Sequence, residues 1–345
     1  EVAKKHDVGV DFSLFKDRFM LTVDYFYEQR DGIFAERNYL PFSVGIPAKG
    51  TSVANVGSVR SYGFDGNFAY KQKVGNVNLT LRGNATFSKN EILEYDEELQ
   101  DFAYKYNRGY QVSQNRGLIA LGLFKDWDDI RNSPDQKMAF GKVEPGDIKY
   151  KDLNDDGVID ANDQCYLGKS WFPSWSYGMG FNINYHNFDL ALFFQGVSDV
   201  SIMANGGSID TGNGDWGASG VGIVPFTGMG LNPSHVITKA LDRWTADNPR
   251  ADAWYPRMTA NATTNDNNYV NSTHWLKDGS YLRLKQASLG YTLENKKLMD
   301  KGIEYLYFYL SGQNLLTFSK FKLWDPELGS NGAKYPLSRM VTLGM

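Results

Sequence analysis

The segment Val77-Asn-Leu-Thr-Leu-Arg-Gly-Asn-Ala-Thr-Phe-Ser88 alternates apolar or small residues with polar residues along its whole length. Successive side chains of a β-strand point to opposite faces, so a strand here has one apolar face and one polar face. The same period of two recurs over 61–71, 176–185 and 305–313. Followed along the chain, it predicts nine strands, at 8–15, 19–28, 59–71, 77–88, 174–185, 188–196, 281–293, 303–313 and 339–345.

The connections between these strands alternate strictly between short and long. The short ones are 16–18, 72–76, 186–187 and 294–302, and the long ones are 29–58, 89–173, 197–280 and 314–338. All short connections therefore lie at one end of the strands. A soluble sandwich with Greek-key connections has no reason to sort its loops in this way, whereas a transmembrane β-barrel has short periplasmic turns and long extracellular loops.

Strand length and aromatic placement also favour a membrane barrel. Several strands reach about 10 residues, which is enough to cross a bilayer at a tilt. Aromatic residues gather at strand ends, as at Tyr25, Tyr27, Trp171, Trp175 and Phe188, which suits the interfacial girdles of such barrels. The alternative is an antiparallel sheet whose apolar face covers a soluble core.

The composition of the 345 residues excludes several protein classes. With 42% apolar and 14% aromatic residues the chain is not disordered, and no apolar run approaches the length of a transmembrane helix. A net charge of −4 argues against a nucleic-acid partner. The single Cys165 cannot form an internal disulfide.

We expect residues 1–345 to be an all-β fold, the C-terminal portion of a large antiparallel transmembrane β-barrel without its plug domain. The chain starts almost inside a strand and stops at Met345, early in the last one. An open sheet would present unpaired backbone groups to lipid, so further strands must close it. No signal peptide opens the chain, which indicates a mature chain, a cytoplasmic one or a piece of a longer one.

The strongest chemical motif lies in the predicted extracellular loop 89–173, between Asp152 and Asp163. A calcium loop takes oxygen ligands at positions 1, 3, 5, 7, 9 and 12, with Gly at position 6. The residues in those ligand positions are Asp152, Asn154, Asp156, Val158 through its carbonyl, Asp160 and Asp163, and Gly157 is at position 6. Position 12 is Asp rather than Glu, as in the shorter calcium loops of dockerin-like modules. We expect structural calcium; the alternative is an acidic turn without a metal.

The predicted extracellular loop 197–280 opens with a Gly-rich stretch and then predicts a short amphipathic helix after Ser234. Ile237, Leu241 and Trp244 would share one face of this helix, which Asp247-Asn-Pro249 would end. Aromatic side chains of this loop could stack on sugar rings or on peptide side chains, or could simply pack the loop. These candidate ligand or lid contacts are Trp216, Trp244, Trp254, Tyr255 and Trp275.

Enzyme signatures are missing from the sequence. The four histidines have no metal-binding spacing, and no nucleophile elbow, phosphate loop or dinucleotide fingerprint occurs. We therefore expect no catalytic residues and no organic cofactor. The competing reading from another class is a secreted, calcium-stabilised β-sandwich that binds glycans or cleaves them.

Several ordered stretches resemble one protein family. They are Pro145-Gly-Asp-Ile-Lys-Tyr-Lys-Asp-Leu-Asn-Asp-Asp-Gly-Val-Ile-Asp160, Phe188-Asp-Leu-Ala-Leu-Phe-Phe-Gln-Gly196, Leu241-Asp-Arg-Trp-Thr245, Ser280-Tyr-Leu-Arg-Leu-Lys285 and Leu310-Ser-Gly-Gln-Asn-Leu-Leu316. They resemble the C-terminal half of the SusC/RagA family, the TonB-dependent outer-membrane importers of Bacteroidetes. The resemblance implies a complete barrel of 22 strands, a plug, a TonB-box region and a SusD-like surface lipoprotein as lid.

The resemblance also implies a mechanism and a location. Ligand would be trapped between the extracellular loops and the lipoprotein, and the TonB complex would open the plug of this multi-pass barrel in the outer-membrane lipid. The commonest cargo in the family is an oligosaccharide, and a peptide is the main alternative. The residues themselves do not distinguish the two.

Overall fold

The computed structural model describes residues 1–37, 53–137, 142–205, 238–258, 266–330 and 335–345. Its main feature is one nine-stranded sheet in the order β1-β2-β3-β4-β11-β12-β15-β16-β17, in which all neighbours are antiparallel. The strands are β1 (Val2–Leu14), β2 (Phe19–Glu36), β3 (Val53–Val74), β4 (Val77–Glu94), β11 (Trp175–Tyr185), β12 (Phe188–Ser198), β15 (Tyr281–Leu293), β16 (Leu306–Ser319) and β17 (Met340–Gly344). All nine predicted strands are confirmed.

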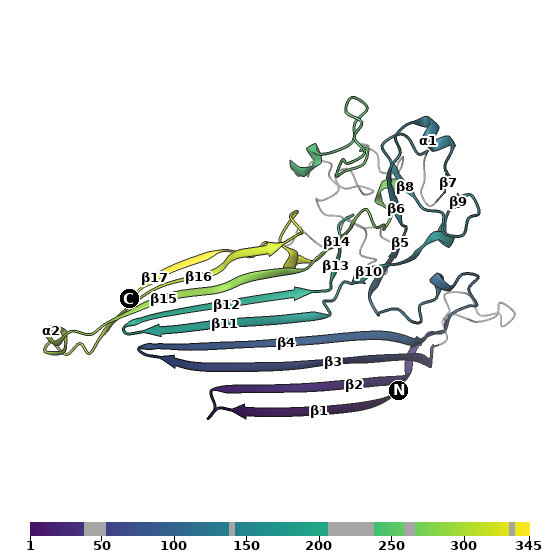
Figure 1. Ribbon diagram of the computed structural model, residues 1–345. Coiled ribbons are helices and arrows are strands. Elements are labelled where there is room, and N and C mark those ends of the chain that lie inside the picture. The colour runs from purple at the N-terminus through teal and green to yellow at the C-terminus, as the bar shows by residue number, and fades with distance from the viewer. Residues whose placement is uncertain (38–52, 138–141, 206–237, 259–265, 331–334) are drawn as a thin grey trace.

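The short connections lie together at one end of the sheet and the long ones at the other, as predicted (Figure 1). Positive backbone φ angles make the tight turns, at Lys16 (59°), Gly75 (57°) and His186 (49°). The fourth short connection holds the single-turn helix α2 (Lys296–Met299). No helix within the described residues has the length and apolar character needed to cross a membrane.

The register separates the residues of each strand into two faces. Phe181 on β11 lies opposite Leu81 on β4 and Leu192 on β12, whereas Asn182 lies opposite Thr80 and Ala191. The alternation seen in the sequence therefore becomes one continuous apolar face and one mainly polar face across these strands.

Several strands, β3 and β4 among them, are longer than predicted. Their pairing continues to Ser58 and Glu94, past the point where apolar alternation stops. There the backbone ladder is supported by polar contacts across the strands, such as the ion pair between Arg60 Nη2 and Glu91 Oε2 at 2.6 Å. Alternating hydrophobicity marks only the part of a strand that has an apolar face. The sequence pattern therefore does not predict these polar strand ends.

A second body of structure stands at the long-loop end of the sheet (Figure 1). It contains four small two-stranded pairings and the short helix α1 (Trp127–Arg131). The pairings are β5 (Gln114–Gly117) with β10 (Cys165–Ser170), β6 (Ala120–Leu123) with β8 (Ile148–Tyr150), β7 (Asp135–Gln136) with β9 (Val158–Ile159), and β13 (Ser201–Met203) with β14 (Leu276–Asp278). Short 3-10 turns are η2 (Ala103–Lys105), η3 (Ala161–Asp163), η4 (Thr238–Leu241), η6 (Asp266–Tyr269) and η7 (Pro326–Leu328).

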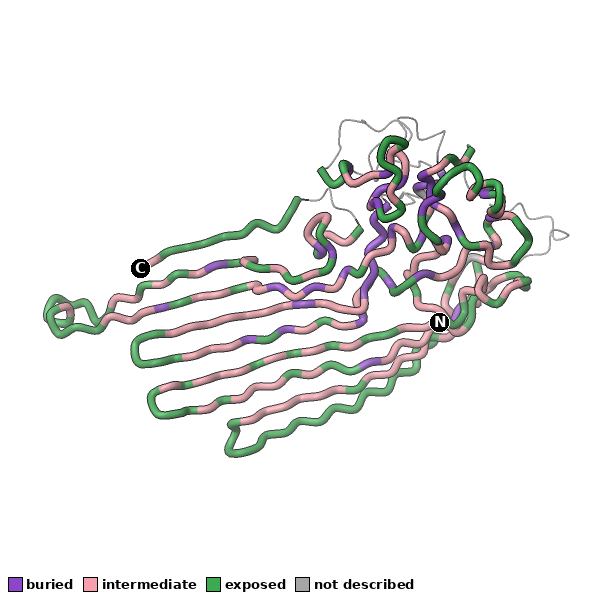
Figure 2. The backbone as a smooth tube through the Cα atoms, turned by 45° about the horizontal axis from the view of Figure 1, so that its top comes forward, coloured by how far each residue is buried: buried purple, intermediate pink, exposed green. Residues whose placement is uncertain are grey.

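Most buried residues lie in this second body and few lie on the long strands (Figure 2). Large apolar side chains stay exposed along the sheet, among them Phe64, Met179, Leu289 and Leu310. The sheet is open among the described residues, with β1 and β17 at its edges. A soluble sandwich would pack a second sheet on such a face, and these strands instead form a single sheet in chain order, so the β-sandwich reading is wrong.

The prediction of an amphipathic helix after Ser234 is also wrong for the residues that the structure describes there, from Thr238 onward. Only the four-residue turn η4 forms, Leu241 is 77% exposed and Trp244 is buried. The backbone groups that a helix would use are taken by another segment, because Trp244 N donates to Tyr255 O and Tyr255 N donates to Asp242 O, both at 3.0 Å. Ile237 lies outside the described residues.

Candidate ligand-binding region

The described parts of 95–173 and 199–280 pack into one body, called the loop unit below. Leu118 N donates to Asn271 O at 2.8 Å and Thr273 N donates to Leu118 O at 3.0 Å, which ties the first segment to the second. The apolar core is shared between them. Its buried members include Leu118, Ile148, Tyr150, Ile159, Trp244, Tyr255 and Trp275. Two segments that the sequence presents as separate loops therefore act as one structural unit.

Buried polar side chains fix the two segments in register. Gln136 Nε2 donates to Ile148 O at 2.9 Å and to Asn267 Oδ1 at 2.7 Å, and Asn268 Nδ2 donates to Asp147 Oδ1 at 2.8 Å. Burial raises the pKa of Tyr150 well above its usual range, and its hydroxyl donates to Asn267 O at 2.6 Å. Polar groups buried with their partners specify one arrangement of the chain, so this network holds the loops in a defined shape.

The motif at 152–163 forms a compact loop closed by its own carboxylates. Asp152 accepts from Asp155 N at 2.7 Å and from Gly157 N at 2.8 Å, and Gly157 has the positive φ of 84° that the turn requires. Asp163 is fully buried and accepts from Leu153 N at 2.7 Å and Asp160 N at 2.8 Å, which joins the two ends of the loop.

The loop offers the donor chemistry of a calcium site without converging side chains. Asp152, Asp156 and Asp163 carry oxygen donors that suit a hard cation. In the part of the chain that the structure describes, however, no three His, Cys, Asp or Glu side chains meet closely enough to hold a metal ion. The loop carboxylates accept from the loop's own amides instead, so calcium binding here stays a prediction.

Of the aromatic candidates, Trp244, Tyr255 and Trp275 are buried in the core of the loop unit. Trp275 is fully enclosed and its Nε1 donates to Asn268 O at 2.7 Å. These three therefore pack the unit and present little surface to a ligand. Trp254 is only partly buried, and Trp216 lies outside the described residues.

Trp254 lies on the wall of a cavity of about 620 Å³. The other lining residues are Thr238, Lys239, Lys277, Asp278, Lys320, Phe321, Lys322 and Leu323. They come from η4, from the end of β14 and from the segment that follows β16, so the cavity opens where the loop unit meets the sheet. A volume of this size is typical of small-molecule sites.

Comparison with known proteins supports the architecture. No protein-family model matches the chain. The chain is 26% identical over 375 aligned positions to TonB-dependent receptor P26 of Formosa agariphila, covering 100% of this chain and 34% of that protein. It is 22% identical to TonB-dependent receptor SusC of Bacteroides thetaiotaomicron, covering 98% of this chain and 31% of that protein. The solved RagAB peptide importer in the open-open state aligns with a TM-score of 0.68 at 19% identity, covering 99% of this chain and 34% of that one.

Over its whole length the chain is similar to TonB-dependent receptors, SusC among them, and it shares a fold with RagAB. It spans about a third of the length of the curated relatives that it matches. Its nine-stranded sheet is a portion of a large antiparallel barrel of the kind that RagAB forms, and the matched curated proteins are TonB-dependent receptors.

Two features of this region have no local signal in the sequence. The lysines around the cavity come from three places in the chain, and only Lys320-Phe-Lys322 is visible as a local pair. The ion pair between Asp147 and Arg257 joins residues 110 positions apart. No local pattern predicts such pairs, since they depend on how the two loops pack.

Proposed function

We propose that the complete protein imports a nutrient actively across the bacterial outer membrane. The observation that carries this proposal is the match of the whole chain to TonB-dependent receptors, together with a fold shared with a solved importer. The missing catalytic motifs and the single continuous sheet fit a passage for solutes better than a site of chemistry.

The two faces of the sheet have separate roles in this proposal. The apolar face, with Leu81 and Phe181, meets lipid, and the polar face, with Thr80, Arg82 and Asn182, lines a wet lumen. Barrels of this kind alternate apolar and polar residues along each strand, and a polar interior can hold both water and a hydrophilic plug.

The proposed partners are a SusD-like surface lipoprotein and the TonB complex. The long loops all lie at one end of the sheet, and we place the lipoprotein over this end, where it closes on the captured nutrient. TonB would act from the other side of the membrane through a region that lies outside this chain. Both partners follow from the relationship to SusC and RagAB.

The proposed cargo is an oligosaccharide. Partly buried Trp254 on a cavity wall can pack against the C–H face of a sugar ring. A peptide is the second candidate, because the similar solved structures are those of the RagAB peptide importer.

The proposal is tested by deleting the gene from its host and growing the strain on oligosaccharide mixtures or on peptide mixtures as the sole carbon source. We expect growth on one oligosaccharide mixture to be lost and then restored by the wild-type gene, but not by a gene that lacks its TonB-contacting segment. Loss of growth on peptides alone would show that the cargo is a peptide and not an oligosaccharide. Unchanged uptake of every nutrient would overturn the import function.

We also propose that the 152–163 loop binds calcium in a structural role. The support is the oxygen-only ligand pattern, the turn at Gly157 and the closure of the loop by Asp163. All six ligand positions belong to the chain, which leaves none for a substrate. Calcium would replace some of the amide contacts of Asp152 and Asp156 and would stiffen this part of the loop unit.

A further inference from the structure

The cavity beside Trp254 is unusual in its charge. Four of its nine lining residues are lysines and one is an aspartate, although the whole chain has a net charge of −4. A surface with the average composition of this chain would be slightly acidic. The lysines are therefore concentrated at one hollow, where a low-dielectric wall strengthens their attraction for an anion.

Three of these lysines have no carboxylate partner within the described residues. Lys239 Nζ pairs with Asp242 Oδ2 at 2.7 Å, but Lys277, Lys320 and Lys322 take part in no ion pair among the residues that the structure describes. Lys277 Nζ donates to the backbone oxygen of His274 at 2.6 Å, and burial lowers the pKa of Lys277. Lys277 is partly buried, and an ammonium in such a place without a counter-ion gains stability when an anion binds beside it.

Trp254 helps to position two of the four ammonium groups, those of Lys239 and Lys277. The Nζ atoms of Lys239 and Lys277 lie 5.9 Å and 5.3 Å from the centre of the Trp254 ring. Trp254 in turn packs edge to face on Tyr255 at 4.4 Å and on Trp275 at 5.7 Å, so its position is fixed by the core of the loop unit. Pre-positioned cations cost a ligand less ordering entropy than free surface lysines would.

The side chains that line the cavity favour some anionic ligands over others. Most of its polar side chains are donors: the four lysine ammonium groups can only donate, whereas the carboxylate of Asp278 and the hydroxyl of Thr238 can accept. A peptide brings one N–H donor per residue, and most of these would find no acceptor here. Sugar hydroxyls can accept as well as donate. The apolar surface of Trp254, Phe321 and Leu323 suits the C–H face of a sugar ring.

We propose that this cavity binds an acidic sugar residue, one that carries a carboxylate or a sulfate group, within the imported oligosaccharide. The oxyanion would lie between Lys277, Lys320 and Lys322, and the ring would pack on the apolar wall beside Trp254. This inference rests on the proposed import of oligosaccharides and narrows it to anionic ones.

The test uses the full-length receptor in complex with its lipoprotein and two pairs of probes. The pairs are tetragalacturonate with its methyl ester, and sulfated with unsulfated dextran tetrasaccharide. We expect at least one acidic probe to bind about tenfold more tightly than its neutral counterpart, and added salt to weaken this preference. The double variant K320Q/K322Q should lose about tenfold in affinity for that acidic probe and should keep its affinity for the neutral one.

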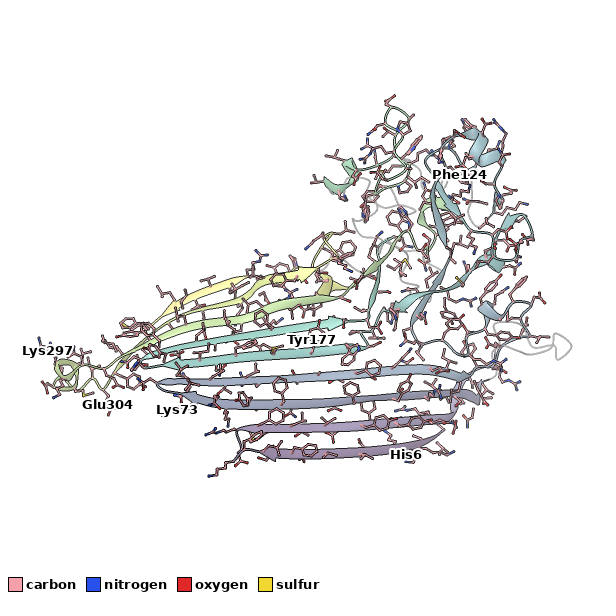
Figure 3. All side chains as sticks on the ribbon, viewed as in Figure 1. His6, Lys73, Phe124, Tyr177, Lys297 and Glu304 are labelled. Carbon is pink, nitrogen blue, oxygen red and sulfur yellow. The ribbon has the colours of Figure 1, made fainter. Side chains whose placement is uncertain are left out.

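The matched control is K296Q/K297Q, which removes the same charge from α2. Lys297 is labelled at the far end of the strands from the loop unit in Figure 3, and both control lysines are exposed. We expect this variant to bind every probe as the wild type does. Because Lys320 and Lys322 are themselves exposed, their replacement by Gln leaves the fold intact, which circular dichroism of the variant complex checks.

Three results would overturn the inference. They are equal binding of acidic and neutral probes, unchanged binding of the acidic probe by K320Q/K322Q, and a lysine-dependent preference for pentaglutamate over both acidic glycans. If the receptor still imports neutral oligosaccharides in the first two cases, the proposed function stands and only the acidic subsite is lost. The third case would show that the cavity takes an acidic peptide.

Discussion

Asp147 is fully buried and accepts two hydrogen bonds from the guanidinium group of Arg257, from Nε at 3.0 Å and from Nη2 at 3.1 Å. The same guanidinium contacts Glu144 at 3.2 Å, and Asp147 Oδ1 also accepts from Asn268 Nδ2 at 2.8 Å. This cluster joins the two long segments of the loop unit. The shape of the loop unit therefore depends on one buried ion pair as well as on the apolar core.

The substitution Asp147→Ala should loosen the loop unit. It leaves the Arg257 guanidinium, which is only 18% exposed, without its main partner, and breaking a buried pair from one side costs about 3–5 kcal/mol. Hydrogen exchange of the full-length receptor should then speed up at 144–150 and 253–258 and stay unchanged in β11 and β12. Asp128→Ala is the control, because its pair with Arg131 is exposed and contributes about 0–1 kcal/mol. Equal exchange in the two variants would contradict this role for Asp147.

Calcium binding at 152–163 is tested by a pair of isosteric changes. Asp156→Asn removes a carboxylate at ligand position 5, whereas Asp155→Asn removes the same charge at a position that is not a ligand. Asn also tolerates the positive φ of 60° at Asp155. We expect the Asp156 variant to lose calcium affinity by tenfold or more and the Asp155 variant to change little.

The readout for this pair is terbium luminescence. Tyr104 lies close enough to sensitise it, because its hydroxyl donates to Asn162 O at 2.8 Å at the edge of the loop. A signal that calcium does not displace, or that both variants reduce equally, would indicate an acidic turn without a specific metal.

A feature of this fold can be predicted from the sequence to the extent that it depends on residues close together in the chain. Strand existence and order could be predicted because the alternation around Val77–Ser88 is written into consecutive residues. The structure around Trp244 could not be predicted, since its backbone pairs with that of Tyr255, eleven positions later. The cavity lysines were missed for the same reason: Lys277 and Lys320 become neighbours only through the packing of the loop unit on the sheet.

The stability of the loop unit should fall at acidic pH because of His274. Burial, with a smaller effect of the Lys277 charge, lowers the pKa of His274 from 6.5 to about 4. The unfolded segment binds a proton as the pH falls through about 6.5, whereas the folded one stays neutral until about 4. The stabilisation is therefore complete above pH 6.5 and is lost as the pH falls toward 4, by up to about 3 kcal/mol.

Urea unfolding of the loop unit, followed by tryptophan fluorescence from pH 4.5 to 7.5, measures this effect. The His274 ring lies 4.7 Å from that of Trp275, which reports on the same site. His274→Gln keeps a polar side chain that does not titrate, so its unfolding midpoint should vary less over this range. If the variant keeps the full pH dependence, other titratable groups are responsible.

The two faces of the sheet should respond very differently to a new charge. Phe181 and Asn182 are neighbours on β11 and point to opposite faces, and each lies between β4 and β12. Phe181→Arg places a guanidinium among Leu81 and Leu192 on the face assigned to lipid, which costs about 2–4 kcal/mol near the bilayer midplane. Asn182→Arg adds the same side chain to the polar face, where water and the plug can solvate it, and should cost much less.

Urea unfolding of the full-length receptor in lipid vesicles measures both free-energy costs. Leu81→Arg repeats the substitution on the apolar face of the neighbouring strand. Equal costs for the two faces would mean that the apolar side does not face lipid.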